Sequence, residues 1–234
     1  MGVSNYHLIT FGCSHTFGHG LPDCWFDGNK VGRTPSKLAW PNLLQKKLSM
    51  RSIDNKSWPG NSNKQILKSI IDYSNYNKNS LVIILWSNFN RKTIYKNQKE
   101  CFAMMPHHTT LSKKDLPSKI WNDPDRKNIV RKIRSYYGEY HEEFDAIFDT
   151  LVYVNYAHAF LKSKSIRSYH LIAEHELDFE REYFKKFNIT GINLKEFVWQ
   201  TDYKIDDALD TPVAHPGLKS QKLFAENIEK WFFK

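Results

Sequence analysis

Residues 6–16 read YHLITFGCSHT, an apolar run that passes at once into a glycine, a cysteine and a serine. The run is typical of a buried strand, and the small residues after it predict a tight turn into a helix. In open α/β folds, ligands bind at the carboxyl ends of the strands. The Ser14 hydroxyl is therefore expected where such a fold holds its substrate, beside backbone N–H groups that can bind an oxyanion. A serine that only caps the next helix is the alternative.

Three further segments follow in the order that a serine esterase needs. They are residues 58–63 (WPGNSN), residues 81–88 (LVIILWSN) and residues 210–217 (DTPVAHPG). Together with residues 6–16, these segments resemble the four sequence blocks of the SGNH (GDSL-type) hydrolase family. Each block is short and degenerate, so the resemblance depends on their order and their placement after strands or before the last helix. It extends from residue 9 to about residue 233.

The resemblance implies a role for each block. Ser14 is the expected nucleophile, and His215 is the expected base, since a histidine accepts and returns protons near neutral pH. The oxyanion hole is expected to consist of the Ser14 amide, Gly60 and the side chain of Asn88. Asp210 is expected to orient the His215 ring. Each residue also has an ordinary structural reading, as a helix cap, a turn glycine, a loop histidine or a surface carboxylate.

The blocks depart from the family pattern in three places. Cys13 replaces the aspartate of Gly-Asp-Ser, at a position that takes no part in nucleophilic attack. The third block keeps only its asparagine, and Asn90 is a second candidate for that role. The family places its acid three residues before the histidine, where this chain has Pro212. Asp210 is the nearest acid upstream, followed by Asp207 and Asp206, and a main-chain carbonyl could also serve.

Apolar runs and helical spacing alternate along the chain, which predicts a parallel sheet with helices on both faces. Expected strands are residues 6–11, 52–54, 81–85 and 168–173, and expected helices are residues 36–50, 63–73, 144–161, 177–187 and 219–232. The fold class is therefore α/β, a three-layer flavodoxin-like sandwich with about five parallel strands, as the SGNH resemblance also implies. Residues 1–234 are expected to form one domain.

Residues 90–134 are expected to be a long insertion in this domain. The segment follows Asn88 directly and is rich in Lys, Asn, Asp, Pro and His. Long loops at this edge of an α/β enzyme often cover the substrate. We therefore expect the segment to gate the site and to favour anionic substrates through its basic residues, which include Arg91, Lys92, Lys96, Lys113, Lys114 and Lys119. A polar excursion with no role is the alternative.

Composition limits the partners and the location. The net charge is +9, but the basic residues are dispersed and no nucleic-acid motif accompanies them, so specific nucleic-acid binding is not expected. No apolar run approaches the ~20 residues that span a bilayer, and the N-terminus lacks a signal sequence. Three cysteines cannot all pair, which favours a reducing compartment. We expect a cytoplasmic protein that is not a membrane protein; the oligomeric state stays open.

Other residues near the blocks invite alternative roles. Cys13 could be a thiol nucleophile, but it is expected to point into the core. His15, His19 and Asp23 could bind a metal only on a continuous helix, which the intervening glycines and a proline disfavour, so neither a metal nor another cofactor is expected. Among the aromatic residues, Trp40 reads as helix packing, whereas Trp25 and Phe26 could form a sugar or acyl platform.

These features predict a serine esterase that forms an acyl-enzyme on Ser14. The family resemblance favours a short acyl group on a carbohydrate, so the expected partner is a small-molecule or glycan ester, including anionic ones. A lipid esterase or an acyltransferase is a second possibility. A non-catalytic binding or structural protein on the same fold is a third, because the third and fourth blocks are weak.

Overall fold

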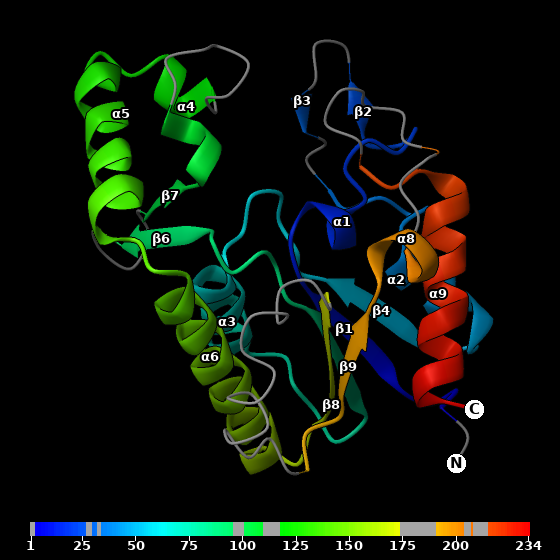
Figure 1. Ribbon diagram of the computed structural model, residues 1–234. Helices are drawn as coiled ribbons and strands as arrows, with labels where there is room; N and C mark the ends of the chain where they lie inside the picture. The colour runs from blue at the N-terminus through cyan, green and yellow to red at the C-terminus, as the bar shows by residue number, and fades with distance from the viewer. Residues whose placement is uncertain are drawn as a thin grey trace.

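A sheet of five parallel strands forms the centre of the molecule in a computed structural model that describes residues 3–26, 30–31, 34–95, 101–109, 118–173, 191–203, 207 and 215–234 (Figure 1). In spatial order the strands are β4 (Ser52–Asn55), β1 (His7–Phe11), β5 (Ser80–Leu85), β8 (Arg167–Ala173) and β9 (Leu194–Phe197). Every neighbouring pair in this sheet is parallel. The predicted α/β fold with about five parallel strands is confirmed.

The register of the central strands brings two turns together. All six residues of β5 are buried, as expected of a strand covered on both faces. Its neighbour β1 pairs with it up to its last residue, Phe11, which lies opposite Ile84. The chain therefore leaves β1 toward Ser14 and leaves β5 toward Asn88 at the same edge of the sheet.

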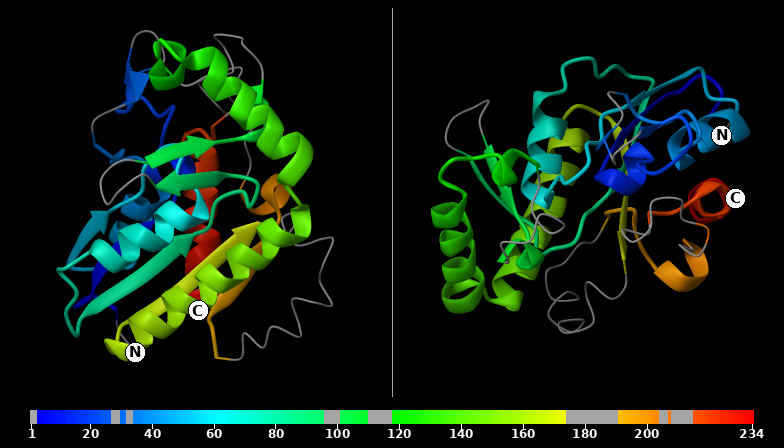
Figure 2. Two further views of the ribbon diagram at one scale, coloured as in Figure 1. Left: turned by 90° about the vertical axis from the view of Figure 1, so that its left-hand side faces the viewer. Right: turned by 90° about the horizontal axis from the view of Figure 1, so that it is seen from above.

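Helices cover both faces of the sheet and give the molecule three layers. Figure 2 shows α3 (Asn63–Asp72) and α6 (Glu143–Ser163) over one face. The opposite face carries α2 (Trp40–Lys47) and α9 (Leu218–Phe232). A separate apolar core lies on each side, with Ile66 and Leu161 in one and Leu44 and Phe224 in the other. Burial of these two cores holds the sheet edge, and thus the site, in place.

Most of the described residues in the range 92–140 form regular structure. They comprise the antiparallel strands β6 (Lys92–Tyr95) and β7 (Cys101–Met104), the 3-10 helix η1 (Pro106–Thr109), α4 (Ser118–Trp121), α5 (Arg126–Ser135) and the π-helix η2 (Tyr136–Tyr140). This part has a small core of its own, in which Met104, Ile120, Val130 and Ile133 are buried. The described part of the polar loop expected from the sequence therefore consists largely of two antiparallel strands and of helices that share a small core with them.

Most predicted elements exist with shifted ends. The helix predicted at residues 36–50 is the shorter α2, and the strand at residues 52–54 is β4. The edge strand β9 was not predicted, and the helix predicted at residues 177–187 lies outside the described residues. Three short elements complete the description: α1 (Ser14–Phe17), α8 (Trp199–Asp202) and the hairpin of β2 (Trp25–Phe26) with β3 (Lys30–Val31). No described helix combines the length and apolar character needed to cross a membrane.

Candidate active site

Ser14 is the first residue of α1, and its position depends on a close approach of this turn to β5. It is almost fully buried, at 4% exposure. A Cβ on Gly12 would lie 2.2 Å from the Thr16 Oγ1 and 3.1 Å from the Leu85 carbonyl oxygen. Only glycine fits between them. The tight strand-to-helix turn predicted from the sequence is therefore present, with the serine at the carboxyl edge of the sheet.

His215 lies directly beside this turn. It precedes α9, is 8% exposed, and its ring stacks on that of His19 with centroids 4.5 Å apart. The ring of His15, the neighbour of Ser14, meets it edge-on at 5.5 Å. The fold thus brings together two predicted site segments that are 200 residues apart in the sequence.

Side chains from α9 and the segment before it hold the two segments together. The buried Gln221 amide donates to the carbonyl oxygens of His15 and Pro216, at 3.4 Å each. Its side-chain oxygen accepts from the Trp40 amide at 2.8 Å. The Tyr203 hydroxyl donates to the same His15 carbonyl at 3.1 Å. These bonds link the turn of Ser14 to the loop of His215 independently of either side chain.

Burial and neighbouring groups disfavour protonation of His15, the residue after Ser14. Burial lowers the pKa of His15 well below 6.5, and the charges of His215, Arg91 and His19 lower it further. Asp23, considered as a metal ligand with His15 and His19, instead accepts from the Ser36 hydroxyl and the Lys37 amide. In the described ranges, no group of three or more His, Cys, Asp or Glu side chains could hold a metal ion.

Asp207 is used at the start of α9. Its carboxylate accepts from the amides of Gly217 at 3.0 Å and Lys219 at 2.6 Å, and from the amide and hydroxyl of Ser220. Burial acts to raise its pKa, but these hydrogen bonds outweigh that effect and lower it. Asp207 therefore fixes the helix that follows His215. Asp210 and Asp206 lie outside the described residues.

The predicted oxyanion residue Gly60 sits in a turn that is bonded to the serine turn. The Gly12 carbonyl accepts from the Trp58 amide at 3.3 Å and from the Asn61 side chain at 3.2 Å. Gly60 itself has a φ of +82°, in the left-handed region that favours glycine. The residues after β4 are thus held against the residues after β1.

The turn that carries Asn88 is held in the same way from the other side. The Asn63 side chain accepts from the Ser87 amide at 2.7 Å and donates to the Ser87 carbonyl and to the Thr150 hydroxyl, both at 3.0 Å. Asn88 is exposed, and its side-chain oxygen accepts from the Asn90 amide at 2.8 Å. This bond orients the Asn88 side chain.

Asn90, the second candidate for the third block, has other partners. Its side-chain oxygen lies 2.6 Å from the His141 Nε2, and its carbonyl accepts from the Tyr137 hydroxyl at 2.7 Å. These contacts direct Asn90 toward the segment after α5. Asn88 is therefore the better candidate for the oxyanion hole.

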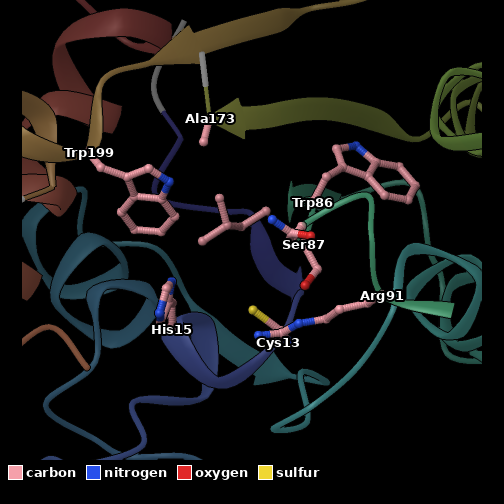
Figure 3. A pocket seen from close by; sticks show the side chains of 9 residues that line it. Cys13, His15, Trp86, Ser87, Arg91, Ala173 and Trp199 are labelled. Carbon is pink, nitrogen blue, oxygen red and sulfur yellow. The ribbon is translucent and has the colours of Figure 1, made fainter. Parts of the chain in front are cut away.

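A cavity of about 190 Å³ opens beside these turns (Figure 3). Its apolar walls are Leu85, Trp86, Ala173 and Trp199, and its polar lining is Cys13, His15, Ser87, Asn88 and Arg91. Cys13 was expected to point into the core. It is buried, but its side chain lines this cavity, because the turn after Gly12 directs it toward the end of β5.

Two aromatic predictions meet different outcomes. Trp40 is fully buried and packs edge-on against Phe224, as predicted. The side chains of Trp25 and Phe26 lie outside the described part of the structure. Trp58, which the sequence did not single out as a platform, is 52% exposed beside Gly60, and its ring meets Phe17 edge-on at 5.5 Å. The available sequence signal was a tryptophan two residues before the glycine of a predicted site block.

Asn63→Leu is expected to lower kcat about tenfold or more, because Ser87 and Asn88 lose their support and small misplacements slow catalysis strongly. It should also destabilise the fold by about 2 kcal/mol, since the Ser87 amide is left unpaired. Steady-state kinetics and thermal unfolding measure the two effects. Asn155→Leu is the control, as it removes a side-chain bond to the Leu151 carbonyl within α6, away from the site. Equal kcat losses in both variants would contradict this role of Asn63.

Comparison with known proteins supports the fold. No protein-family model matches the sequence, and no curated protein matches it. Among solved structures, it is similar to a lipolytic protein of the G-D-S-L family from Desulfitobacterium hafniense, with 12% identity, a TM-score of 0.51, and 97% of this chain and 100% of that chain covered.

Two esterases have the same fold. An acetyl xylan esterase from Butyrivibrio proteoclasticus matches with 12% identity and a TM-score of 0.56, over 97% of this chain and 64% of that chain. An esterase from Pseudoalteromonas, solved with monoethylphosphonate as inhibitor, matches with 12% identity and a TM-score of 0.54, over 98% of this chain and 100% of that chain. At these identities the likeness is one of fold, and it confirms the resemblance to the SGNH hydrolases in that respect.

Proposed function

We propose that this protein is a serine esterase in which Ser14 forms an acyl-enzyme. The observation that supports this most strongly is the contact between the His215 ring and the turn of Ser14. The turns that carry Gly60 and Asn88 lie at the same edge of the sheet. These are the parts that acyl transfer requires: a hydroxyl, an adjacent base and donors for an oxyanion. The fold similarity to esterases is consistent with this proposal.

In the first half of the reaction, the Ser14 hydroxyl attacks the ester carbonyl and its proton passes to His215. The carbonyl oxygen becomes an oxyanion, which accepts hydrogen bonds from the Ser14 and Gly60 amides and the Asn88 side chain. When the intermediate collapses, the bond to the alcohol oxygen breaks, and that oxygen takes the proton from His215. The products of this half are the free alcohol and the acyl-enzyme.

In the second half, water replaces the alcohol. His215 accepts a proton from the water molecule as it attacks the acyl carbonyl, and returns it to Ser14 when the acid leaves. We propose Asp210 as the group that orients the His215 ring, from its place five residues earlier in the sequence. Asp207 is the weaker candidate, because its carboxylate already accepts four hydrogen bonds at the start of α9.

The proposed substrate is a short acyl ester of a carbohydrate. The cavity, which is lined by Cys13 and His15 on either side of Ser14 rather than by Ser14 itself, is small, and this suits an acetyl-sized group better than a long chain. Trp58 stands more than half exposed two residues before Gly60, and exposed aromatic faces stack on the apolar faces of sugar rings. Its contact with Phe17, at the end of α1, places the indole on the same side as the serine turn.

Trp58→Ala is expected to lower kcat/KM for acetylated oligosaccharides about tenfold, because the sugar loses its stacking surface. Hydrolysis of 4-nitrophenyl acetate, which has no sugar ring, should change little. The assay is acetate release from a series of acetylated oligosaccharides, compared with nitrophenol release from the small ester.

Trp58→Phe is the matched control, since it keeps an aromatic face against Phe17 and should retain most of the activity. Equal losses on both substrates in Trp58→Ala would contradict the sugar platform. A folded wild-type protein that hydrolyses neither substrate would favour a non-catalytic binding protein.

A further inference from the structure

Arg91 occupies a distinctive place in the candidate site. It follows Asn88 by three residues, and its amide donates to the Asn88 carbonyl at 3.2 Å, which closes a turn. Its side chain then extends into the cavity, and Figure 3 shows the guanidinium reaching toward Cys13. The cation therefore lies within the space next to the oxyanion residues, where a substrate group would meet it.

The charge of Arg91 is not balanced by an acidic side chain from the described residues. Among the described residues, its one side-chain hydrogen bond is long, 3.5 Å from Nη1 to the Asn61 carbonyl oxygen. Its neighbour Lys92, in contrast, pairs with Asp149 at 2.9 Å. A guanidinium has five N–H donors in a planar fork that matches a carboxylate. Most of these donors have no hydrogen-bond partner among the described residues.

The surroundings of Arg91 strengthen an interaction with an anion. Leu85, Trp86 and Trp199 wall the cavity with apolar surface, and electrostatic interactions are stronger beside apolar surface than in bulk water. The other ionisable groups among the described lining residues are His15 and Cys13, and neither is a carboxylate. An anion that enters the cavity would meet Arg91 without a competing carboxylate from the lining residues.

We propose that Arg91 binds a carboxylate of the substrate, so that the protein prefers esters with an anionic group close to the scissile carbonyl. This inference rests on the proposed esterase function and names its substrate class. The carboxylate could belong to the acyl group, as in a half-ester of a short dicarboxylic acid, or to the alcohol, as in an ester of an acidic sugar. Both present the same chemistry to Arg91.

Among the basic residues expected to matter in residues 90–134, Arg91 is the one whose described side chain lines the cavity. Lys92 forms an ion pair with Asp149. Three other lysines, Lys96, Lys113 and Lys114, lie outside the described residues, and so does the side chain of Lys119. Long-range attraction by dispersed lysines would act on encounter and would be screened beyond about 8 Å at physiological salt. A contact with Arg91 inside a cavity is screened much less, so the two effects differ in their salt dependence.

The kinetic test compares two pairs of esters. Mono-4-nitrophenyl succinate against 4-nitrophenyl acetate places the carboxylate on the acyl side, and 4-acetoxybenzoate against its methyl ester places it on the alcohol side. In Arg91→Gln, the ratio of kcat/KM for the charged over the neutral ester should fall about 10- to 100-fold in one pair. The pair affected identifies which side of the ester carries the anion.

Two further variants keep the result interpretable. Lys92→Gln removes the same charge from the adjacent residue and should leave both ratios unchanged. Arg91→Lys keeps the charge but lacks the planar guanidinium, so its ratio of kcat/KM for the charged over the neutral ester should lie between those of wild type and Arg91→Gln. The ratios should persist at high salt. Ratios that are the same in wild type and Arg91→Gln for both pairs would overturn the inference, even if every variant remained an active esterase.

A binding measurement separates this inference from the proposed function. Succinate should raise the Tm of wild type and of Lys92→Gln in a concentration-dependent way, but not that of Arg91→Gln. Absence of hydrolysis together with this shift would reject the esterase and keep the anion site. The opposite result is hydrolysis of the neutral esters with no rise in Tm on addition of succinate and no difference between wild type and Arg91→Gln in the ratio of kcat/KM. That result would reject the anion site and keep the esterase.

Discussion

Ser14→Ala is expected to lower kcat for 4-nitrophenyl acetate by a factor of about 10⁴ or more, because no other group supplies the attacking oxygen of the acyl-enzyme. The substitution removes one buried hydroxyl from the first residue of α1 and should leave the Tm nearly unchanged. Nitrophenol release and thermal unfolding of the same preparations measure the two quantities.

Cys13 provides the matched control for this experiment. Its thiol lines the cavity one residue before Ser14, so it is the nearest alternative nucleophile. Cys13→Ser should retain most of the activity, and Cys13→Ala should do the same. If Cys13→Ala is inactive while Ser14→Ala retains activity, the thiol and not the hydroxyl carries the reaction.

His215→Gln is expected to have an effect of similar size, a loss of about 10⁴-fold or more in kcat, because the hydroxyl then has no base. Glutamine keeps the approximate volume of the ring in a position that is only 8% exposed, so the fold should persist. The kcat of the purified variant and its circular-dichroism spectrum are the measurements.

His19 and the two aspartates are the comparisons for His215. His19→Phe keeps the ring stack at His215 and should cost less than about tenfold, whereas a loss equal to that of His215→Gln would move the base to His19. Asp210→Asn should lower kcat without a change in Tm. Asp207→Asn should lower the Tm, because it weakens the bonds at the start of α9.

The central sheet could be predicted from the sequence because its strands are continuously apolar. The six residues of β5 are all buried, and a run of that kind has few other structural readings. The edge strand β9 reads LKEF, and only Phe197 of its four residues is buried. Its charged residues gave no apolar run, and its pairing with β8 is visible only in three dimensions.

The structure of the segment after Asn88 was harder to predict from the sequence, because this segment also has few apolar residues. In α5, ten residues include five Lys or Arg, and only Val130 and Ile133 are buried. This narrow apolar stripe packs against Met104 of the hairpin rather than against the main core. A polar composition then resembles a loop, although a few apolar residues at helical spacing are enough to build a small core.

The candidate site was predictable in outline because parallel strands end at one edge. Ser14 and Asn88 follow neighbouring strands, and the register places their turns together. The roles of Asp207 and Gln221 depend on bonds across 10 to 206 positions in the sequence and could not be inferred from spacing. Arg91 was recognised as basic, but only its entry into the cavity distinguishes it from the other cations.

The most direct test of the account is covalent labelling of the intact protein with a fluorophosphonate, which reacts with serines activated by a neighbouring base. Intact mass should increase by one phosphonyl group, and peptide mapping should place it on Ser14. Ser14→Ala and His215→Gln should remain unlabelled under the same conditions, while Cys13→Ser should label like wild type. A well-folded wild-type protein that hydrolyses no ester and takes up no label, or takes it up on another residue, would contradict the proposed acyl-enzyme on Ser14.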